Sequence, residues 1–138
     1  MKSKISKALL LILLRVFIIS SLLSFVIFQA FNATKYNSFE KKQGDFIEAI
    51  AGLVWIFILT CCSLTIYFNL LKSVRDNLIL CLLSFFFVPL VVIVLYGYSG
   101  VSKGDTISFY IYTGSFMIIH AIYFIRFHLK AKNSKVDI

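Results

Sequence analysis

Few side chains in this sequence are of the types that do chemistry, and His120 stands out among them. It lies in the stretch "MIIHAIYFIRFH", residues 117–128, with apolar neighbours on both sides. A histidine in such a setting can hand on a proton or hold a ligand, or it can make one structural hydrogen bond. Arg126 and His128 mark the end of the same apolar run. His120 is therefore the first candidate for a functional residue.

The other apolar runs each carry polar residues at a similar depth. Counting 1.5 Å per helical residue places these groups roughly 5–12 Å from the same boundary of the membrane core. Thr113 precedes His120 by one heptad and so shares its helical stripe. Because polar groups inside a membrane turn away from lipid, we expect an intramembrane polar layer. Its predicted members are Arg15, Ser63, Thr65, Ser84, Thr113 and His120.

This polar layer has two interpretations. In the first, Arg15, His120 and nearby hydroxyls line a small cavity open to the cytoplasm, which holds an anionic headgroup or passes a proton. In the second, Arg15 reaches the membrane surface, and His120 makes one bond between helices, worth about 0.6 kcal/mol on average. Pro89 frees the carbonyl of Phe85 nearby, an acceptor for Arg15, His120 or a water molecule. The sequence favours the second interpretation.

None of the six acidic residues lies in the middle of an apolar run: four lie at the ends of runs, Glu40 lies in the first loop and Asp137 lies in the tail. Asp45 precedes the second run and Glu48 follows three residues later, which is the spacing of a capping box. Asp76 and Asp105 stand at the starts of the third and fourth runs, where a negative charge complements the helix dipole. We therefore predict that Asp45, Glu48, Asp76 and Asp105 are helix caps. If the second helix begins earlier, Glu48 instead faces the bundle from within.

The three cysteines are predicted to be small packing residues rather than reactive or metal-binding ones. Cys61 and Cys62 are adjacent in the second run, and Cys81 lies about 8 Å from them in depth by helical rise. This mismatch disfavours a disulfide, and no histidine or carboxylate cluster accompanies the thiols to form a metal set. The sequence also lacks a phosphate-cradling glycine loop, a nucleophile elbow and a His-Glu-x-x-His motif. We predict no enzyme activity, no cofactor and no metal site.

Four long apolar runs must position these residues. The chain of 138 residues is 60% hydrophobic and 14% charged, with a mean hydropathy of +0.93. About 20 apolar residues suffice for a helix to cross a bilayer. The first run is longer than the apolar core of a signal peptide and lacks a small-x-small cleavage site, so we interpret it as a retained span. We predict one integral membrane domain, residues 1–138, with spans over 8–31, 47–71, 77–98 and 106–127.

The loops predict the arrangement of these spans. Short connections favour an all-α, up-down antiparallel bundle of four transmembrane helices. The N-terminal segment up to Arg15, the second loop, and Arg126 with the tail 128–138 hold ten of the 14 basic residues, and the outer loop 32–46 and the third loop hold four. The positive-inside rule then places both termini in the cytoplasm. We expect tyrosines to form an outer interface belt, at Tyr96, Tyr98, Tyr110 and Tyr112.

The charge distribution also indicates the surroundings of the protein. In this orientation the net charge of +8 lies on the cytoplasmic face, where it meets anionic lipid. The basic composition therefore does not imply nucleic acid as a partner. Abundant Phe, Ile, Lys, Ser and Asn suggest an AT-rich bacterial genome, so we predict a multi-pass protein of the bacterial inner (plasma) membrane.

By elimination, the sequence predicts a small non-enzymatic protein that acts through protein–protein contacts in the membrane or the periplasm. A concrete case is an immunity protein against a membrane-acting toxin, with the aromatic, charge-balanced outer loop 32–46 as a contact surface. One alternative is an accessory subunit of a membrane complex. Another is a small transporter or channel that uses the polar layer around Arg15 and His120. Small multidrug transporters also have four spans, but this chain lacks the mid-membrane glutamate of their first span.

Overall fold

Long helices make up nearly all of the part of the chain that the computed structural model describes, which is residues 2–35, 41–99 and 106–133. The described elements are all helical: α1 (Lys2–Lys35), α2 (Lys41–Cys62), the 3-10 helix η1 (Ser63–Leu70), α3 (Lys72–Asp76), α4 (Leu78–Ser99) and α5 (Thr106–Asn133).

Four helical stretches are long and apolar enough to cross a membrane. They are Ile5–Asn32, Phe46–Leu70, Leu78–Tyr98 and Thr106–Lys130. These stretches confirm the all-helical class and the four predicted spans, and they are those of a multi-pass membrane protein. Of the predicted outer loop 32–46, residues 36–40 lie outside the described residues, and the rest belongs to α1 and α2. Of the predicted tail 128–138, residues 134–138 lie outside the described residues, and α5 extends to Asn133.

The second span is not one α-helix throughout, because η1 completes it. Just before the change, the Thr60 hydroxyl donates to the carbonyl of Ile56 at 2.8 Å, and the Ser63 hydroxyl donates to that of Leu59 at 2.9 Å. Such bonds to the preceding turn often bend a helix. The 3-10 helix has three residues per turn, so every third residue shares one face. Accordingly the buried residues of η1 are Ser63, Ile66 and Asn69.

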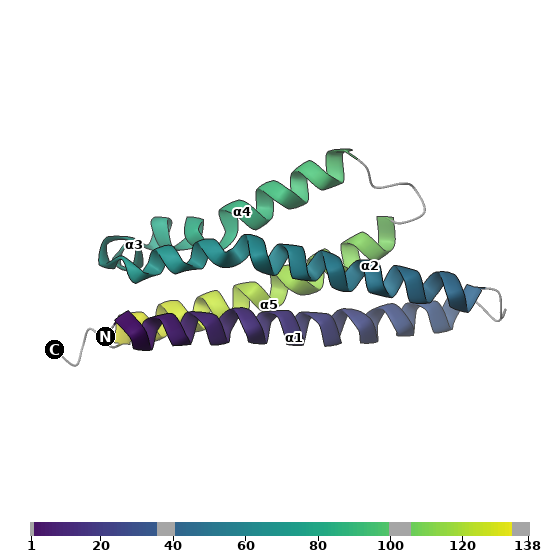
Figure 1. The fold of residues 1–138 in the computed structure, drawn as a ribbon, viewed down its shortest axis with the longest axis horizontal. Coiled ribbons are helices and arrows are strands. Elements are labelled where there is room, and N and C mark those ends of the chain that lie inside the picture. The colour runs from purple at the N-terminus through teal and green to yellow at the C-terminus, as the bar shows by residue number, and fades with distance from the viewer. Residues whose placement is uncertain (1, 36–40, 100–105, 134–138) are drawn as a thin grey trace.

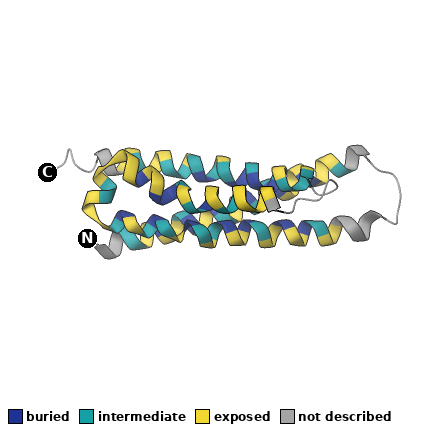
Figure 2. Ribbon diagram, turned by 90° about the horizontal axis from the view of Figure 1, so that it is seen from above, coloured by how far each residue is buried: buried dark blue, intermediate teal, exposed yellow. Residues whose placement is uncertain are grey.

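The interior consists of two apolar clusters at different levels of the bundle. The mid-bundle cluster contains Val16, Phe28, Ala49, Ile56, Leu59, Tyr112 and Phe116. The α3-end cluster contains Leu9, Leu13, Ile66, Cys81 and Phe85. Figure 2 shows that buried and exposed residues alternate along each long helix. The exposed sides are themselves apolar, as expected of helices whose outer faces meet lipid.

Helix α4 is attached mainly at its beginning. There it packs against η1 and α3, and Figure 1 shows its second half diverging from α2. Pro89 lies inside this helix, where a proline removes one backbone hydrogen bond and favours a kink. The beginning of α1, helix α3 and the end of α5 all lie at the same end of the molecule (Figure 1).

Candidate functional site

His120 is fully buried on α5 and binds the backbone of α4. Its Nε2 lies 3.0 Å from the carbonyl oxygen of Phe85. Pro89 has no N–H, so this carbonyl lacks its usual donor within the helix. A carbonyl oxygen accepts only, so Nε2 carries the hydrogen and donates it. Of the three donors considered for this carbonyl, the structure therefore places His120 on it.

Phenylalanine rings surround the imidazole of His120. The ring centroids of Phe85, Phe86 and Phe116 lie 5.5, 5.2 and 5.2 Å from its own. The Phe116 ring is nearly parallel to it, with an interplanar angle of 14°. Within the described part of the chain, Nδ1 is buried without a hydrogen-bond partner. The surroundings of His120 are thus apolar and closed, and they suit a structural bond between α4 and α5.

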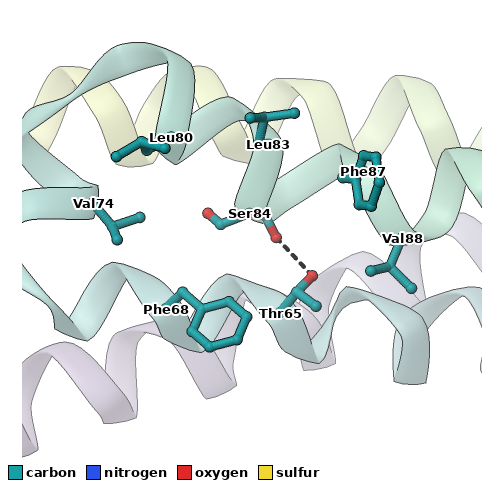
Figure 3. A pocket seen from close by; sticks show the side chains of 8 residues that line it. All are labelled: Thr65, Phe68, Val74, Leu80, Leu83, Ser84, Phe87 and Val88. Carbon is teal, nitrogen blue, oxygen red and sulfur yellow. Dashed lines mark hydrogen bonds between the residues drawn. The ribbon is translucent and has the colours of Figure 1, made fainter.

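A second set of polar contacts joins η1 to α4 through Ser84. The Thr65 hydroxyl donates to the backbone carbonyl of Ser84 at 2.7 Å, as the dashed line in Figure 3 shows. The Asn69 side-chain amide donates to the Ser84 hydroxyl at 2.5 Å, and that hydroxyl donates to the carbonyl of Cys81 at 2.7 Å. The successive carbonyls of Ser84 and Phe85 thereby bind η1 on one side and α5 on the other.

The structure distributes the predicted polar layer over separate contacts. Thr65 and Ser84 meet, and His120 binds α4, but Ser63 donates to its own helix. Thr113 accepts a hydrogen bond from the indole Nε1 of Trp55 at 2.9 Å. Arg15 lies on the exposed side of α1, away from the interior. Arg15 and His120 are therefore not brought together in a shared cavity.

Asp76 is not the cap of the third span, which corrects that prediction. It ends α3, and α4 begins two residues later at Leu78. Asn77 stands between them in an extended conformation, and its Oδ1 accepts from the amides of Ile79 at 3.0 Å and Leu80 at 3.4 Å. Asparagine is among the strongest N-cap residues, because its side-chain oxygen reaches the free amides of the first turn. The cap is thus Asn77.

Glu48 is not a cap either, because α2 begins early. The helix starts at Lys41, so Glu48 lies two turns inside it, and its carboxylate accepts a hydrogen bond from the hydroxyl of Ser108 on α5. This is the alternative in which Glu48 faces the bundle from within. Asp45 also falls inside α2, but its side chain and all of Asp105 lie outside what the structure describes.

Three of the four tyrosines in the predicted belt are exposed and the fourth, Tyr112, is buried. Tyr98 and Tyr110 are exposed, at 95% and 66%, as an interface belt requires. Tyr96 is 48% exposed and also packs against the indole of Trp55 with a centroid separation of 4.5 Å, whereas Tyr112 is buried. Aromatic residues at the ends of spans can therefore face inward as well as toward the membrane surface.

Trp55 and Asn69 are two inward-facing residues with polar groups that the sequence did not lead us to expect. A signal was present for each of them. Asn69 is an asparagine inside an apolar run, and Glu48, Gly52 and Trp55 have the i, i+4, i+7 spacing of one helical face. Among the cysteines, Cys81 packs in the α3-end cluster, whereas Cys61 is exposed and Cys62 is half-buried.

Comparison of the chain with protein-family models, with curated proteins and with solved structures found no match. The function is therefore argued from the geometry of the chain itself.

Proposed function

We propose that this chain is a non-catalytic protein of the bacterial plasma membrane that binds a membrane-embedded partner protein through the outward face of α4. An immunity protein that blocks a membrane-acting toxin works in this way, and so does an accessory subunit of a membrane complex. The hollowed surface of α4 carries the proposal.

Two apolar hollows lie side by side along this face. The first, shown in Figure 3, has a volume of about 350 Å³ and is bounded by η1, α3 and the start of α4, with Phe68, Val74 and Leu80 in its lining. The second has a volume of about 380 Å³ and follows α4 as far as Leu95. Leu83 and Phe87 line both, so the hollows form one continuous face, which we call the α4 face.

A helix with large projecting side chains fits the hollowed α4 face better than a partner with a flat surface does. Membrane helices associate by close packing of side chains, since lipid tails are as apolar as the helices themselves. Large side chains on a partner recur every three or four residues, and such a ridge fits into a groove on its neighbour.

We also propose an up-down arrangement with both termini in the cytoplasm. The beginning of α1, helix α3 and the end of α5, which lie at one end of the molecule, carry Lys7, Lys72, Arg75, Arg126 and Lys130. Clustered bases at one end support the positive-inside assignment. In this orientation they contact anionic lipid of the cytoplasmic leaflet.

Partner capture from native membranes tests the proposal. The tagged full chain is purified in mild detergent beside two variants, Leu83→Ala with Phe87→Ala on α4, and Leu22→Ala with Phe25→Ala on the exposed side of α1. We expect the α4 variant to lose a defined partner that the wild type and the α1 variant retain. Equal capture by all three proteins would contradict the proposal.

A second measurement separates the two kinds of partner. Cells that lack the gene are challenged with the products of neighbouring genes. Loss of protection, restored by the wild type but not by the α4 variant, identifies an immunity protein. Unchanged survival together with loss of a stable complex identifies an accessory subunit.

A further inference from the structure

A larger hollow opens between α2, α4 and α5, near the end of α4 and the beginning of α5. Its volume is about 450 Å³, and its lining includes Glu48, Trp55, Tyr96, Ser108, Phe109 and Tyr112. Pockets that hold small organic ligands have volumes of about 300–1,000 Å³ and combine apolar walls with a few polar groups. The size and composition of this hollow match that description.

Glu48 places a carboxylate in the wall of the hollow. It belongs to the span Phe46–Leu70, and among the described side chains of the four spans it is the only acidic one. The Ser108 hydroxyl donates to one of its oxygens, but the described lining contains no lysine or arginine. A carboxylate in a membrane is costly unless a cation accompanies it, and one hydroxyl offsets this cost only in part.

Three aromatic rings from three helices stand beside this carboxylate. The centroid of Trp55 lies 4.5 Å from that of Tyr96 and 5.6 Å from that of Phe109, and the last two rings are stacked at 5.6 Å. The bond from the Trp55 indole to Thr113 fixes the orientation of the largest ring. Aromatic faces, tryptophan above all, attract cations such as quaternary ammonium groups.

The Tyr112 hydroxyl provides a further polar group in the same lining. It is buried, and no hydrogen-bond partner for it exists among the described residues. Gly52 makes this position possible, because a Cβ added there would overlap the Tyr112 ring. A buried hydroxyl normally finds a partner, so an unused one in the wall of a hollow points to a ligand.

We propose that this hollow binds a lipophilic ammonium ion. The cationic head lies against Glu48, and the apolar body lies along Trp55, Tyr96 and Phe109. The same chemistry is found in the amine headgroup of a membrane phospholipid and in a free amphiphilic amine. Both have an apolar part that suits a hollow lined by residues of three membrane-spanning helices.

The fluorescence of Trp55 reports this binding directly, because the chain contains one tryptophan. The full chain in nanodiscs of phosphatidylglycerol, which has no amine, is titrated with octyltrimethylammonium, and with octanol as a neutral probe of equal chain length. We expect a saturable change in emission with the ammonium compound only. Equal responses to both probes would overturn the proposal, and this comparison needs no variant.

Substitution of the carboxylate gives the second comparison. Glu48→Gln keeps the size of the side chain and its bond to Ser108, and we expect it to weaken ammonium binding by about tenfold or more. Asp76→Asn, a carboxylate outside the spans, is the matched control and leaves binding unchanged. Wild-type affinity in Glu48→Gln would contradict the assignment.

The two sources are separated by lipid composition. Nanodiscs that contain phosphatidylethanolamine are compared with those of phosphatidylglycerol alone. If phosphatidylethanolamine changes the Trp55 emission and displaces octyltrimethylammonium, the ligand is a lipid headgroup. If it does neither while the ammonium probe still binds, the ligand is a free amphiphilic amine.

Discussion

His120 meets the carbonyl of Phe85 where Pro89 leaves that carbonyl without a helical donor. Replacing the imidazole with an apolar side chain leaves a buried acceptor unsatisfied, which costs about 1–3 kcal/mol. We therefore expect His120→Leu to lower the free energy of unfolding by about this amount, measured by SDS titration in mixed micelles. His120→Gln retains an N–H donor and should lose less. Equal stability of His120→Leu and the wild type would contradict a structural role for this bond.

Gly52 and Gly114 offer a matched pair of substitutions. A Cβ at Gly52 overlaps the Tyr112 ring, whereas a Cβ at Gly114 meets nothing within 4 Å. We expect Gly52→Ala to destabilise the protein by about 1–3 kcal/mol through overpacking and to shift the emission of Trp55. Gly114→Ala should be neutral or stabilising by about 0.5–1 kcal/mol, as is usual for glycine inside a helix. The same unfolding assay checks both, and an equal effect of the two substitutions would show that Tyr112 does not depend on Gly52.

Some residue-level contacts could be anticipated from the sequence and others could not. The free carbonyl of Phe85 follows from the absence of an N–H at Pro89, a purely local property, but the choice of His120 over Arg15 or a water molecule as its donor came from the structure. The inward position of Glu48 depends on where α2 begins, and the cap at Asn77 depends on where α3 ends. Both boundaries are set by tertiary contacts over a few residues, which sequence periodicity does not resolve.

The 3-10 helix η1 changes which residues of the second span face inward. Over six residues an α-helix turns through about 600°, which separates Ser63 and Asn69 by about 120°, whereas a 3-10 helix brings them back into line. A prediction that treats the second span as an α-helix throughout therefore does not give the contact between Asn69 and Ser84. The hydroxyls of Thr60 and Ser63, bonded to the preceding turn, accompany the change.

Pro89 couples α4 to α5, and a double-mutant cycle tests this coupling. Pro89→Ala restores an N–H that can bind the Phe85 carbonyl within the helix. In that background His120→Leu no longer leaves the carbonyl unsatisfied, so its cost should fall. We expect a coupling free energy of about 0.5–3 kcal/mol between the two positions. Additive effects on unfolding would mean that His120 and Pro89 act independently.

The orientation of the whole molecule is tested by reporter fusions. Ten of the 14 basic residues are assigned to one side, so we expect both termini and the loop at Lys72 and Arg75 to be cytoplasmic. Green fluorescent protein should fluoresce at these positions, and alkaline phosphatase should be inactive there. Active phosphatase at either terminus would contradict the proposed orientation.

Hydropathy was sufficient to predict the four spans, but it did not predict how the four helices pack against one another. Span length depends on the thickness of the bilayer, a constraint that composition reveals. The course of α4 depends on a proline in its middle, which favours a kink, and on the contact that joins Tyr96 near its end to Trp55 of α2. The α4 face combines residues of η1, α3 and α4, and the hollow at Glu48 combines residues of α2, α4 and α5, so neither could be predicted from the separate spans.

Binding of a partner through the α4 face is the central claim, and photo-crosslinking in living cells tests it most directly. A photoreactive residue is placed at Val94 on α4 or at Val26 on α1, which are 66% and 63% exposed and so meet the surrounding membrane to a similar extent. We predict a discrete crosslinked protein from position 94 and none from position 26. Crosslinking to lipid alone at both positions, or to the same proteins from both, would contradict the account.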